Sequence, residues 1–309
     1  MKPTVTPSGA ALGARIDNVD LSQPLEPETF AFIENALHEH AVICISGQPY
    51  DDESLTRFGS MFGELEISVA KTFHHAQYPS VTVLSNVSVD GKPAGSADAG
   101  QFWHTDLSYN QIAGRASILH AHVVPISDGK ALGNTAFRNM YKAYEALPAD
   151  MRRRLDGMEA VHEFEKIWTT MLAKGSKRPP FTDAQRAEKP PVVHPVVLVH
   201  PWNGRKALCI NRGLVQSIVG VSPKESDELL EFLFDHTEKP EFGFEHEWRT
   251  GDTLVWDNCA SIHLATGGYD SSTPRVMHRV QVLGNEALYR EKNTLGGRLH
   301  TPAPAVSAA

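Results

Sequence analysis

The segment FWHTDLSY, residues 102 to 109, combines the appearance of a β-strand with two side chains that commonly bind metal ions. Successive side chains of a strand alternate between its faces, so His104 and Asp106 project to the same side while Thr105 points away. The spacing therefore predicts that His104 and Asp106 can bind one ion together. Taken alone, the triplet also fits a structural strand histidine, because such triplets arise easily in a chain with 15 histidines.

A third ligand is required by the iron(II) oxygenases, which bind the metal through two imidazoles and one carboxylate on one face of an octahedron. The candidate is His263, in the segment WDNCASIHLA at residues 256 to 265, just after a β-like run that can return to the same end of a barrel. We therefore expect His104, Asp106 and His263 to form one metal site with positions left open for a cosubstrate and oxygen.

Two arginines follow in the segment RVMHR, residues 275 to 279. In a strand Arg275, Met277 and Arg279 share a face. A guanidinium is suited to bind a carboxylate because it donates two parallel hydrogen bonds. Arginines that face a β-rich interior are costly unless they meet anions, whereas the alternative is the solvated face of an edge strand.

Short β-like runs recur along the chain and favour a mainly β protein with flanking helices, built as a sandwich or jelly roll. Asn203-Gly204 predicts a hairpin. Helices are predicted over residues 27 to 41, 51 to 62 and 222 to 236. The β-like runs lie at residues 81 to 86, 102 to 109, 116 to 124, 158 to 164, 192 to 200, 206 to 211, 252 to 258 and 275 to 284.

The length of 309 residues fits a single elaborated β domain, which we place at residues 1 to 293. Residues 165 to 191 are rich in Lys, Arg and Pro and lack a hydrophobic period, so we predict a long exposed loop of the kind that often forms a lid. Residues 294 to 309 are rich in Pro and Ala and are expected to form a flexible tail.

The formal charge of −8 and the absence of a dense Lys/Arg block argue against binding to nucleic acid and favour a small-molecule ligand. No segment approaches the length of apolar chain that spans a membrane, and no signal peptide is recognisable. Cys44, Cys209 and Cys259 are scattered singly, which fits free thiols in a reducing compartment. We expect a cytoplasmic protein.

Several segments, in order, resemble the family of taurine dioxygenase and chlorophenoxyacetate dioxygenase, which are 2-oxoglutarate-dependent oxygenases. The segments are His104-Thr105-Asp106, Gly133-Asn134-Thr135, the WDN…H segment at 256 to 263, and Arg275 to Arg279, and the likeness spans roughly residues 8 to 290. The resemblance implies a double-stranded β-helix (a distorted, cupin-like jelly roll), Fe(II), O₂ and 2-oxoglutarate, and a homo-oligomer, dimer or tetramer. It also implies hydroxylation of a substrate C–H bond with release of succinate and CO₂.

The resemblance also assigns roles to individual positions. His104, Asp106 and His263 match the iron ligands, and Thr135 and Arg275 match the pair that binds the distal carboxylate of 2-oxoglutarate. Arg279 matches an arginine that faces the anionic group of the substrate, although a supporting role toward 2-oxoglutarate stays open.

Departures from the taurine enzyme argue against taurine as the substrate. Cys259 follows WDN where the family often has arginine, and Gly100 replaces a substrate-contacting asparagine. No histidine lies near Ser68, where the taurine enzyme has one in its pocket. We expect the substrate pocket to be formed by Ser68, Gly100, Leu107, Tyr109, Leu214 and Arg279. Since Leu107 and Tyr109 would share a strand face, an aromatic or medium-sized organic anion is favoured.

Two other functions fit parts of this pattern. A His/Asp/His site also suits a zinc hydrolase, which would not need Thr135 and Arg275 as a carboxylate clamp. A non-catalytic jelly-roll protein that binds a metal or anion is the second alternative. The pair His120 and His122 is a rival metal site by spacing, but no carboxylate lies in the same run, so we interpret it as structural, and His74-His75 as surface residues.

Overall fold

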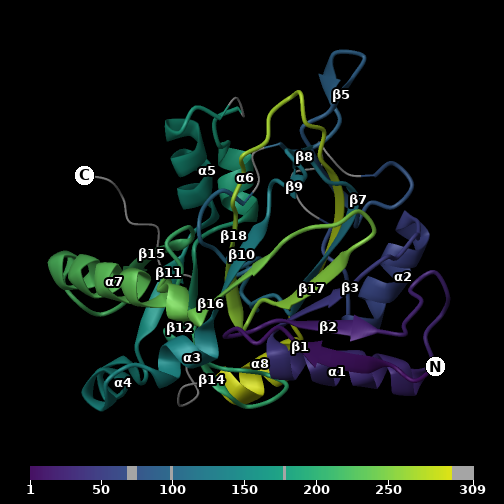
Figure 1. Ribbon diagram of the computed structural model, residues 1–309. Coiled ribbons are helices and arrows are strands. Elements are labelled where there is room, and N and C mark those ends of the chain that lie inside the picture. The colour runs from purple at the N-terminus through teal and green to yellow at the C-terminus, as the bar shows by residue number, and fades with distance from the viewer. Residues whose placement is uncertain (68–74, 98–99, 177–178, 294–309) are drawn as a thin grey trace.

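The computed structural model of the chain describes residues 1–67, 75–97, 100–176 and 179–293, which form a mixed α/β structure with several sheets (Figure 1). The largest described sheet has seven strands in the order β1-β2-β3-β17-β7-β19-β4. Its pairs are antiparallel except for β2 and β3, which are parallel. In sheet order the strands are Thr4–Pro7, Ala14–Asp17, Val42–Ile45, Thr253–Asp257, Ala116–Val123, Val276–Val282 and Thr82–Ser85.

A smaller antiparallel sheet positions one of the candidate ligands. It consists of β16 (Gly243–His246), β10 (Thr135–Asn139) and β18 (Ser261–Ala265) in that order. His263 lies in β18, opposite Phe137, and on its other side it forms an isolated β-bridge with His104. The two backbones exchange hydrogen bonds of 3.1 and 2.7 Å. His104 and His263 are therefore neighbours although 158 residues of chain separate them in the sequence.

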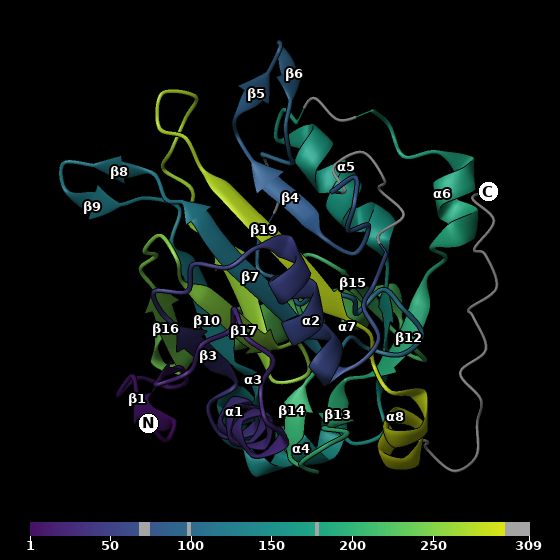
Figure 2. The same ribbon diagram turned by 90° about the vertical axis from the view of Figure 1, so that its right-hand side faces the viewer.

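Alternate side chains of the seven-stranded sheet pack into two separate cores. On one face, Ile43 and Ile118 pack with residues of helices α1 (Pro27–His40) and α2 (Asp52–Phe62). On the other face, Leu119 packs toward the smaller sheet. Figure 2 shows α2 lying against the outer face, so the inner face is the one turned toward β10 and β18.

The other described elements surround these two sheets. A third sheet has the order β12-β11-β15, and three two-stranded pairs are β13-β14, β5-β6 and β8-β9. These strands are Val192–Pro195, Glu159–His162, Val215–Ile218, Val197–Val199, Lys206–Leu208, Ser88–Val89, Lys92–Pro93, Ile126–Ser127 and Lys130–Ala131. The remaining helices are α3 (Met140–Glu145), α4 (Ala149–Leu155), α5 (Phe164–Ala173), α6 (Asp183–Glu188), α7 (Pro223–Thr237), the 3-10 turn η2 (Pro240–Phe242) and α8 (Glu286–Asn293).

Most of the predicted elements are confirmed. The three predicted helices are α1, α2 and α7, and α7 begins where the Ser222 hydroxyl accepts a hydrogen bond from the Glu225 N–H at 3.3 Å. The predicted hairpin is β13-β14, although six residues connect its strands, with Gly204 at φ +72°. No described helix has the length and apolar composition of a membrane span.

Two predictions are wrong, and the alternative that Arg275 and Arg279 lie in an edge strand is excluded. Residues 102 to 109 are not a strand, because only His104 forms a bridge, turns follow it, and Leu107 takes a left-handed φ of +58°. Residues 165 to 191 are not a plain loop, because they contain most of α5 and all of α6. β19 is not an edge strand, since it pairs with both β7 and β4. The predicted tail, 294 to 309, lies outside the described residues.

Candidate active site

His104, Asp106 and His263 converge on one point between the two sheets. The Nε2 atom of His104 lies 3.8 Å from Asp106 Oδ1, and the Nε2 atom of His263 lies 3.8 Å from Asp106 Oδ2. The two imidazole rings are 4.1 Å apart between centroids, and each of the three residues is only 6% exposed. Three potential ligand atoms thus face one another within 4.8 Å.

Neighbouring groups fix the orientation of these side chains. The Nδ1 atom of His104 lies 2.8 Å from the Phe102 carbonyl, which holds the proton on Nδ1 and leaves the Nε2 lone pair for a metal. The Ser117 hydroxyl in β7 donates to Asp106 Oδ2 at 2.7 Å. The Thr105 hydroxyl, pointing the other way, donates to the Asn258 carbonyl at 2.7 Å. The turn after His104 therefore achieves the convergence that a strand was expected to give.

The electrostatics keep the site ready for a cation. Burial lowers the pKa of His104 and lowers that of His263 well below its usual range, so both imidazoles are neutral at pH 7. Burial alone would raise the pKa of Asp106. The charge of Arg279, the two histidines and the Ser117 hydrogen bond outweigh it and hold that pKa well below its usual value. Two neutral imidazoles and one carboxylate form a donor set that fits iron(II) as well as zinc.

Two arginine side chains near the triad have unused hydrogen-bond donors. The Nε atoms of Arg275 and Arg279 are buried, and neither has a hydrogen-bond partner among the described residues. Arg275 is 6% exposed, and its guanidinium carbon lies 5.4 Å from the centre of the Tyr269 ring. The Nη1 atom of Arg279 lies 3.4 Å from Asp106 Oδ1. A buried N–H of a guanidinium without a partner is costly unless it meets an acceptor, so both Nε atoms are candidates to bind an anion.

Thr135, the other residue predicted to bind the cosubstrate, is 4% exposed at the start of β10. Its hydroxyl oxygen accepts a hydrogen bond of 3.0 Å from the Trp248 indole N–H. Because a hydroxyl has one donor and two acceptor positions, the indole leaves the Thr135 O–H free to donate. The turn before Thr135 contacts Arg275, since a Cβ added at Gly133 would lie 3.2 Å from Arg275 Nε. Thr135 and Arg275 therefore border the same part of the interior.

Comparison with known proteins agrees with this geometry. The family model of taurine catabolism dioxygenases, the TauD, TfdA family, matches residues 4–281. The chain belongs to this family. It is an alpha-ketoglutarate-dependent dioxygenase, that is, one that uses 2-oxoglutarate, which rules out the zinc-hydrolase and non-catalytic alternatives.

Individual relatives of this dioxygenase cover most of its length. It is 34% identical over 281 residues to an alpha-ketoglutarate-dependent 2,4-dichlorophenoxyacetate dioxygenase of Burkholderia sp. (strain RASC), covering 87% of this chain and 91% of the relative. It is 32% identical over 294 residues to an alpha-ketoglutarate-dependent sulfate ester dioxygenase of Pseudomonas putida, covering 91% and 89%. The solved structure of AAD-2 with Mn(II) and N-oxalylglycine is similar with a TM-score of 0.76 and 27% identity, covering 93% of this chain and 99% of that one.

The residues predicted to form the substrate pocket are only partly brought together. Tyr109 and Leu214 belong to one apolar cluster, which is completed by Phe102, Phe164, Ile167 and Met171. Gly100 lies beside the triad, since a Cβ added there would be 3.5 Å from His104 Cε1. Leu107, however, packs against Gly114, because its left-handed backbone breaks the expected alternation with Tyr109. Ser68 lies outside the described residues.

Helix α5 supplies much of this apolar wall and was not anticipated as a helix. The Tyr109 and Phe164 rings are 4.5 Å apart between centroids, and the Phe102 ring is 5.1 Å from that of His104. Ile167 and Met171 follow Phe164 at intervals of three and four residues, which places all three on one face of the helix. Apolar rings therefore connect His104 with α5.

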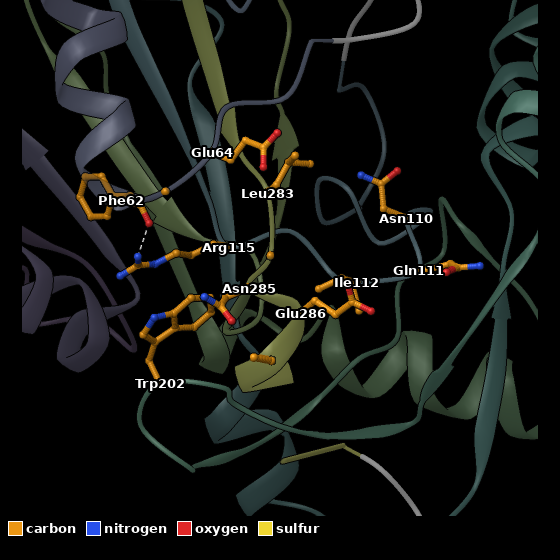
Figure 3. A pocket seen from close by; sticks show the side chains of 13 residues that line it. Phe62, Glu64, Asn110, Gln111, Ile112, Arg115, Trp202, Leu283, Asn285 and Glu286 are labelled. Atoms are coloured by element: carbon orange, nitrogen blue, oxygen red, sulfur yellow. Dashed lines mark hydrogen bonds between the residues drawn. The ribbon is translucent and has the colours of Figure 1, made fainter. Parts of the chain in front are cut away.

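A cavity of about 670 Å³ lies elsewhere and contains none of the triad. Figure 3 shows Arg115 in this cavity, with a hydrogen bond to the carbonyl of Phe62. Arg115 also pairs with the Glu34 carboxylate and lies 4.4 Å from the centre of the Trp202 ring. Because Glu34 already neutralises this guanidinium, the cavity offers no unpaired charge for an anion. We therefore place the candidate active site where the ligand atoms converge, and not at this cavity.

Two supporting residues were missed by sequence reasoning. Ser117 bonds to Asp106, and Trp248 bonds to Thr135. Neither residue type nor spacing distinguishes them from an ordinary strand serine or a core tryptophan. Their roles arise only because β7 and the chain after β16 lie beside the site.

Gly133 offers a direct test of how tightly the turn before Thr135 packs against Tyr269. A Gly133→Ala variant is expected to lower the free energy of unfolding by about 2–4 kcal/mol, because it combines a left-handed φ with a steric clash. Gly133 has φ +69°, and an added Cβ would lie 2.7 Å from the Tyr269 ring. The control Gly129→Ala, at φ +74° with open space around it, should lose only about 1 kcal/mol. Urea denaturation measures both, and equal losses would contradict the crowding of Gly133 against Tyr269.

Proposed function

We propose that the chain is an Fe(II)- and 2-oxoglutarate-dependent dioxygenase that hydroxylates a C–H bond of a small organic anion and releases succinate and CO₂. The observation that carries the proposal is the convergence of two neutral imidazoles and one carboxylate, from His104, Asp106 and His263, together with two arginines whose Nε atoms are buried and unpaired among the described residues. This donor set is the one that leaves open positions on iron(II) for cosubstrate and oxygen. The similar structure that holds Mn(II) and N-oxalylglycine supports it.

We infer that the seven-stranded sheet and the β16-β10-β18 sheet form a double-stranded β-helix, within a single domain of residues 1 to 293. The support lies in the core that both sheets share. Phe137 from β10 and Trp256 from β17 lie 5.8 Å apart between ring centres, and both rings approach His263, at 5.8 and 4.8 Å. The metal ligands would thus stand on a rigid packed scaffold, which precise positioning of a substrate requires.

2-Oxoglutarate would place its distal carboxylate between Thr135 and Arg275. The free O–H of Thr135 can donate one hydrogen bond, and the planar guanidinium of Arg275 has a buried Nε–H without a partner among the described residues. Burial lowers the pKa of Arg275, but a guanidinium stays protonated in proteins. Burial also strengthens a charge-assisted hydrogen bond once the anion has entered.

The contribution of this chain to catalysis is positioning and exclusion of water. Iron, 2-oxoglutarate and O₂, when bound, supply the oxidising chemistry. Ser117 and Arg279 hold the Asp106 carboxylate in place and ionised. The hydrogen bond to the Phe102 carbonyl keeps Nε2 of His104 deprotonated and directed inward. Phe164, Ile167 and Met171 of α5 cover the apolar side and would keep water from the reacting carbon.

The substrate would be an anion with an apolar, preferably aromatic, body. Arg279 offers an unpaired donor for its charged group, and the wall of Phe102, Tyr109 and Phe164 offers ring faces and edges for its body. Burial raises the pKa of Tyr109, so the phenol is neutral and does not repel an anion. Three relatives are named for substrates that are organic anions: 2,4-dichlorophenoxyacetate, (S)-phenoxypropionate and a sulfate ester.

A panel of anions tests this proposal directly. With Fe(II), 2-oxoglutarate and O₂, we expect phenoxyacetate and aryl or alkyl sulfates to stimulate succinate release far more than taurine does. Equal stimulation by taurine would contradict the apolar pocket. A chain that forms no succinate with any anion, under conditions where iron binds, would contradict the proposed reaction.

Arg279→Ala separates the two possible roles of this arginine. We expect the apparent KM for the anionic substrate to rise about 100-fold, the loss expected for one charge-assisted hydrogen bond, while the KM for 2-oxoglutarate changes less than tenfold. Steady-state kinetics with each reactant varied in turn measures both. If the KM for 2-oxoglutarate rises more than the KM for the anionic substrate, Arg279 belongs to the cosubstrate site instead.

A further inference from the structure

A second group of metal-binding side chains lies on the outer face of the seven-stranded sheet, opposite the active site. It consists of Asp52 at the start of α2, His122 in β7 and His278 in β19. Figure 2 shows α2 lying across these two strands. His278 and Arg279 are adjacent in β19, so their side chains project to opposite faces, and the sheet separates this group from the triad.

A break in the strand register lies at His122. In the pairing of β7 with β19, Val276 is opposite Val123 and Met277 is opposite Ala121, so His122 is an extra residue. Such a bulge changes the direction of a side chain, and bulges are frequent beside functional sites. The His122 and His278 rings lie 4.1 Å apart between centroids, at an angle of 61°.

The three side chains have the geometry of an incomplete coordination sphere. Asp52 Oδ1 lies 2.6 Å from His278 Nδ1, and one ligand atom from each residue lies within 4.8 Å of the others. The side chains of Asp52 and His278 are 10% and 16% exposed, which leaves a route to solvent. The Nε2 atom of His122 is buried and has no hydrogen-bond partner among the described residues. Ordinary packing explains the hydrogen bond of His278 but leaves this nitrogen unsatisfied.

We propose that Asp52, His122 and His278 bind a divalent metal ion of the zinc type, at a site distinct from the catalytic triad. Two imidazoles and one carboxylate are three of the four ligands of a tetrahedral zinc site. The ion would replace the proton between Asp52 and His278, and would satisfy the free nitrogen of His122. Water would occupy the fourth position, or His75, whose Nε2 lies 3.7 Å from Asp52 Oδ2.

The surrounding charges favour a cation here. Burial and the neighbouring His278 lower the pKa of His122, so its imidazole is neutral at pH 7. Burial raises the pKa of Asp52, but the hydrogen bond and charge of His278 outweigh it and leave that pKa below its usual value. Asp51 and Glu53 flank Asp52, and within the described ranges no lysine or arginine forms an ion pair with it.

His120, the partner of His122 in the sequence pattern, is not one of the proposed ligands. Its ring contacts the ring of His122. Its Nδ1 atom lies 3.0 Å from the Thr253 hydroxyl, and its ring stacks on Tyr50 at 4.2 Å. Burial lowers its pKa to about 4, so it adds no positive charge. The carboxylate that is missing from the His120-His122 run is supplied by Asp52, and a second imidazole is supplied by His278, both from distant segments of the chain.

Titration of the metal-free full-length chain with Co(II) tests the proposal. We expect two equivalents to bind, one with the weak visible spectrum of six-coordinate Co(II) and one with the intense bands of four-coordinate Co(II). Asp52→Asn and His122→Phe should each weaken the four-coordinate equivalent at least about 100-fold, while His40→Gln on α1 should leave it unchanged.

Two results would overturn the proposal. One is a wild-type chain that binds only the six-coordinate equivalent, and the other is a four-coordinate band that survives both Asp52→Asn and His122→Phe. Asp52→Asn keeps the size of the side chain at a helix start, so it remains informative if His122→Phe fails to fold. His104→Ala should remove only the six-coordinate equivalent, which distinguishes failure at this site from failure of the proposed active site.

Discussion

Asp106→Ala is expected to abolish coupled turnover of 2-oxoglutarate and substrate, with a loss of at least about 1000-fold in kcat/KM, equivalent to about 4 kcal/mol or more. The variant removes the only carboxylate of the triad and leaves two imidazoles to hold the metal. It also removes the carboxylate that pairs with Arg279 and one of the hydrogen-bond partners of the Ser117 hydroxyl. Succinate release measures the loss, and circular dichroism should show the fold retained.

Ser117→Ala is the matched control for this prediction. It removes the hydrogen bond to Asp106 Oδ2 but leaves the carboxylate, so we expect a loss of about 10- to 100-fold, as is usual for a group that orients a metal ligand. Iron content after dialysis should fall much further in Asp106→Ala than in Ser117→Ala. Wild-type turnover by Asp106→Ala would refute the assignment of the triad.

Arg275→Ala is expected to raise the apparent KM for 2-oxoglutarate at least about 100-fold, because two charge-assisted hydrogen bonds are worth about 3 kcal/mol or more. The remaining pocket cannot compensate, since Thr135 can donate only one bond. Initial rates at varied 2-oxoglutarate, with the organic substrate saturating, measure the effect.

Arg275→Lys distinguishes geometry from charge. Lysine keeps the positive charge but not the planar pair of donors, so recovery should be partial. Arg249→Ala, which removes an exposed arginine near β17, controls for general loss of positive charge and should leave the KM unchanged. An unchanged KM in Arg275→Ala would place the distal carboxylate elsewhere.

The convergence of His104, Asp106 and His263 could be expected from the sequence, because residue chemistry and family motifs single these residues out without an exact backbone. Their roles, and those of the two arginines, stay predictions. The reasoning about local structure was less successful. His104 and Asp106 converge through a turn that is anchored by pairing with His263, and such a long-range pairing leaves no local periodic signal. Phe164 to Ala173 form a helix because an apolar face packs on Tyr109, although Lys and Pro dominate the segment that follows.

The groups that support the site could not be predicted, since their roles depend on which strands become neighbours. Ser117 bonds to Asp106 only because β7 lies beside the turn that carries Asp106. Trp248 bonds to Thr135 only because β16 pairs with β10. The same holds for His122, whose nearest carboxylate, Asp52, lies 70 residues earlier in the sequence. Side chains that are polar but not distinctive in sequence acquire function through tertiary contacts.

An anaerobic titration of the metal-free chain with Fe(II) and 2-oxoglutarate tests the central claim most directly. We predict the weak visible charge-transfer band of the iron chelate, its loss in Asp106→Ala, a higher 2-oxoglutarate requirement in Arg275→Ala, and a shift when an organic anion of the correct class is added. A chain that shows no band with Fe(II) and 2-oxoglutarate, yet binds zinc tightly at the triad, would contradict the account.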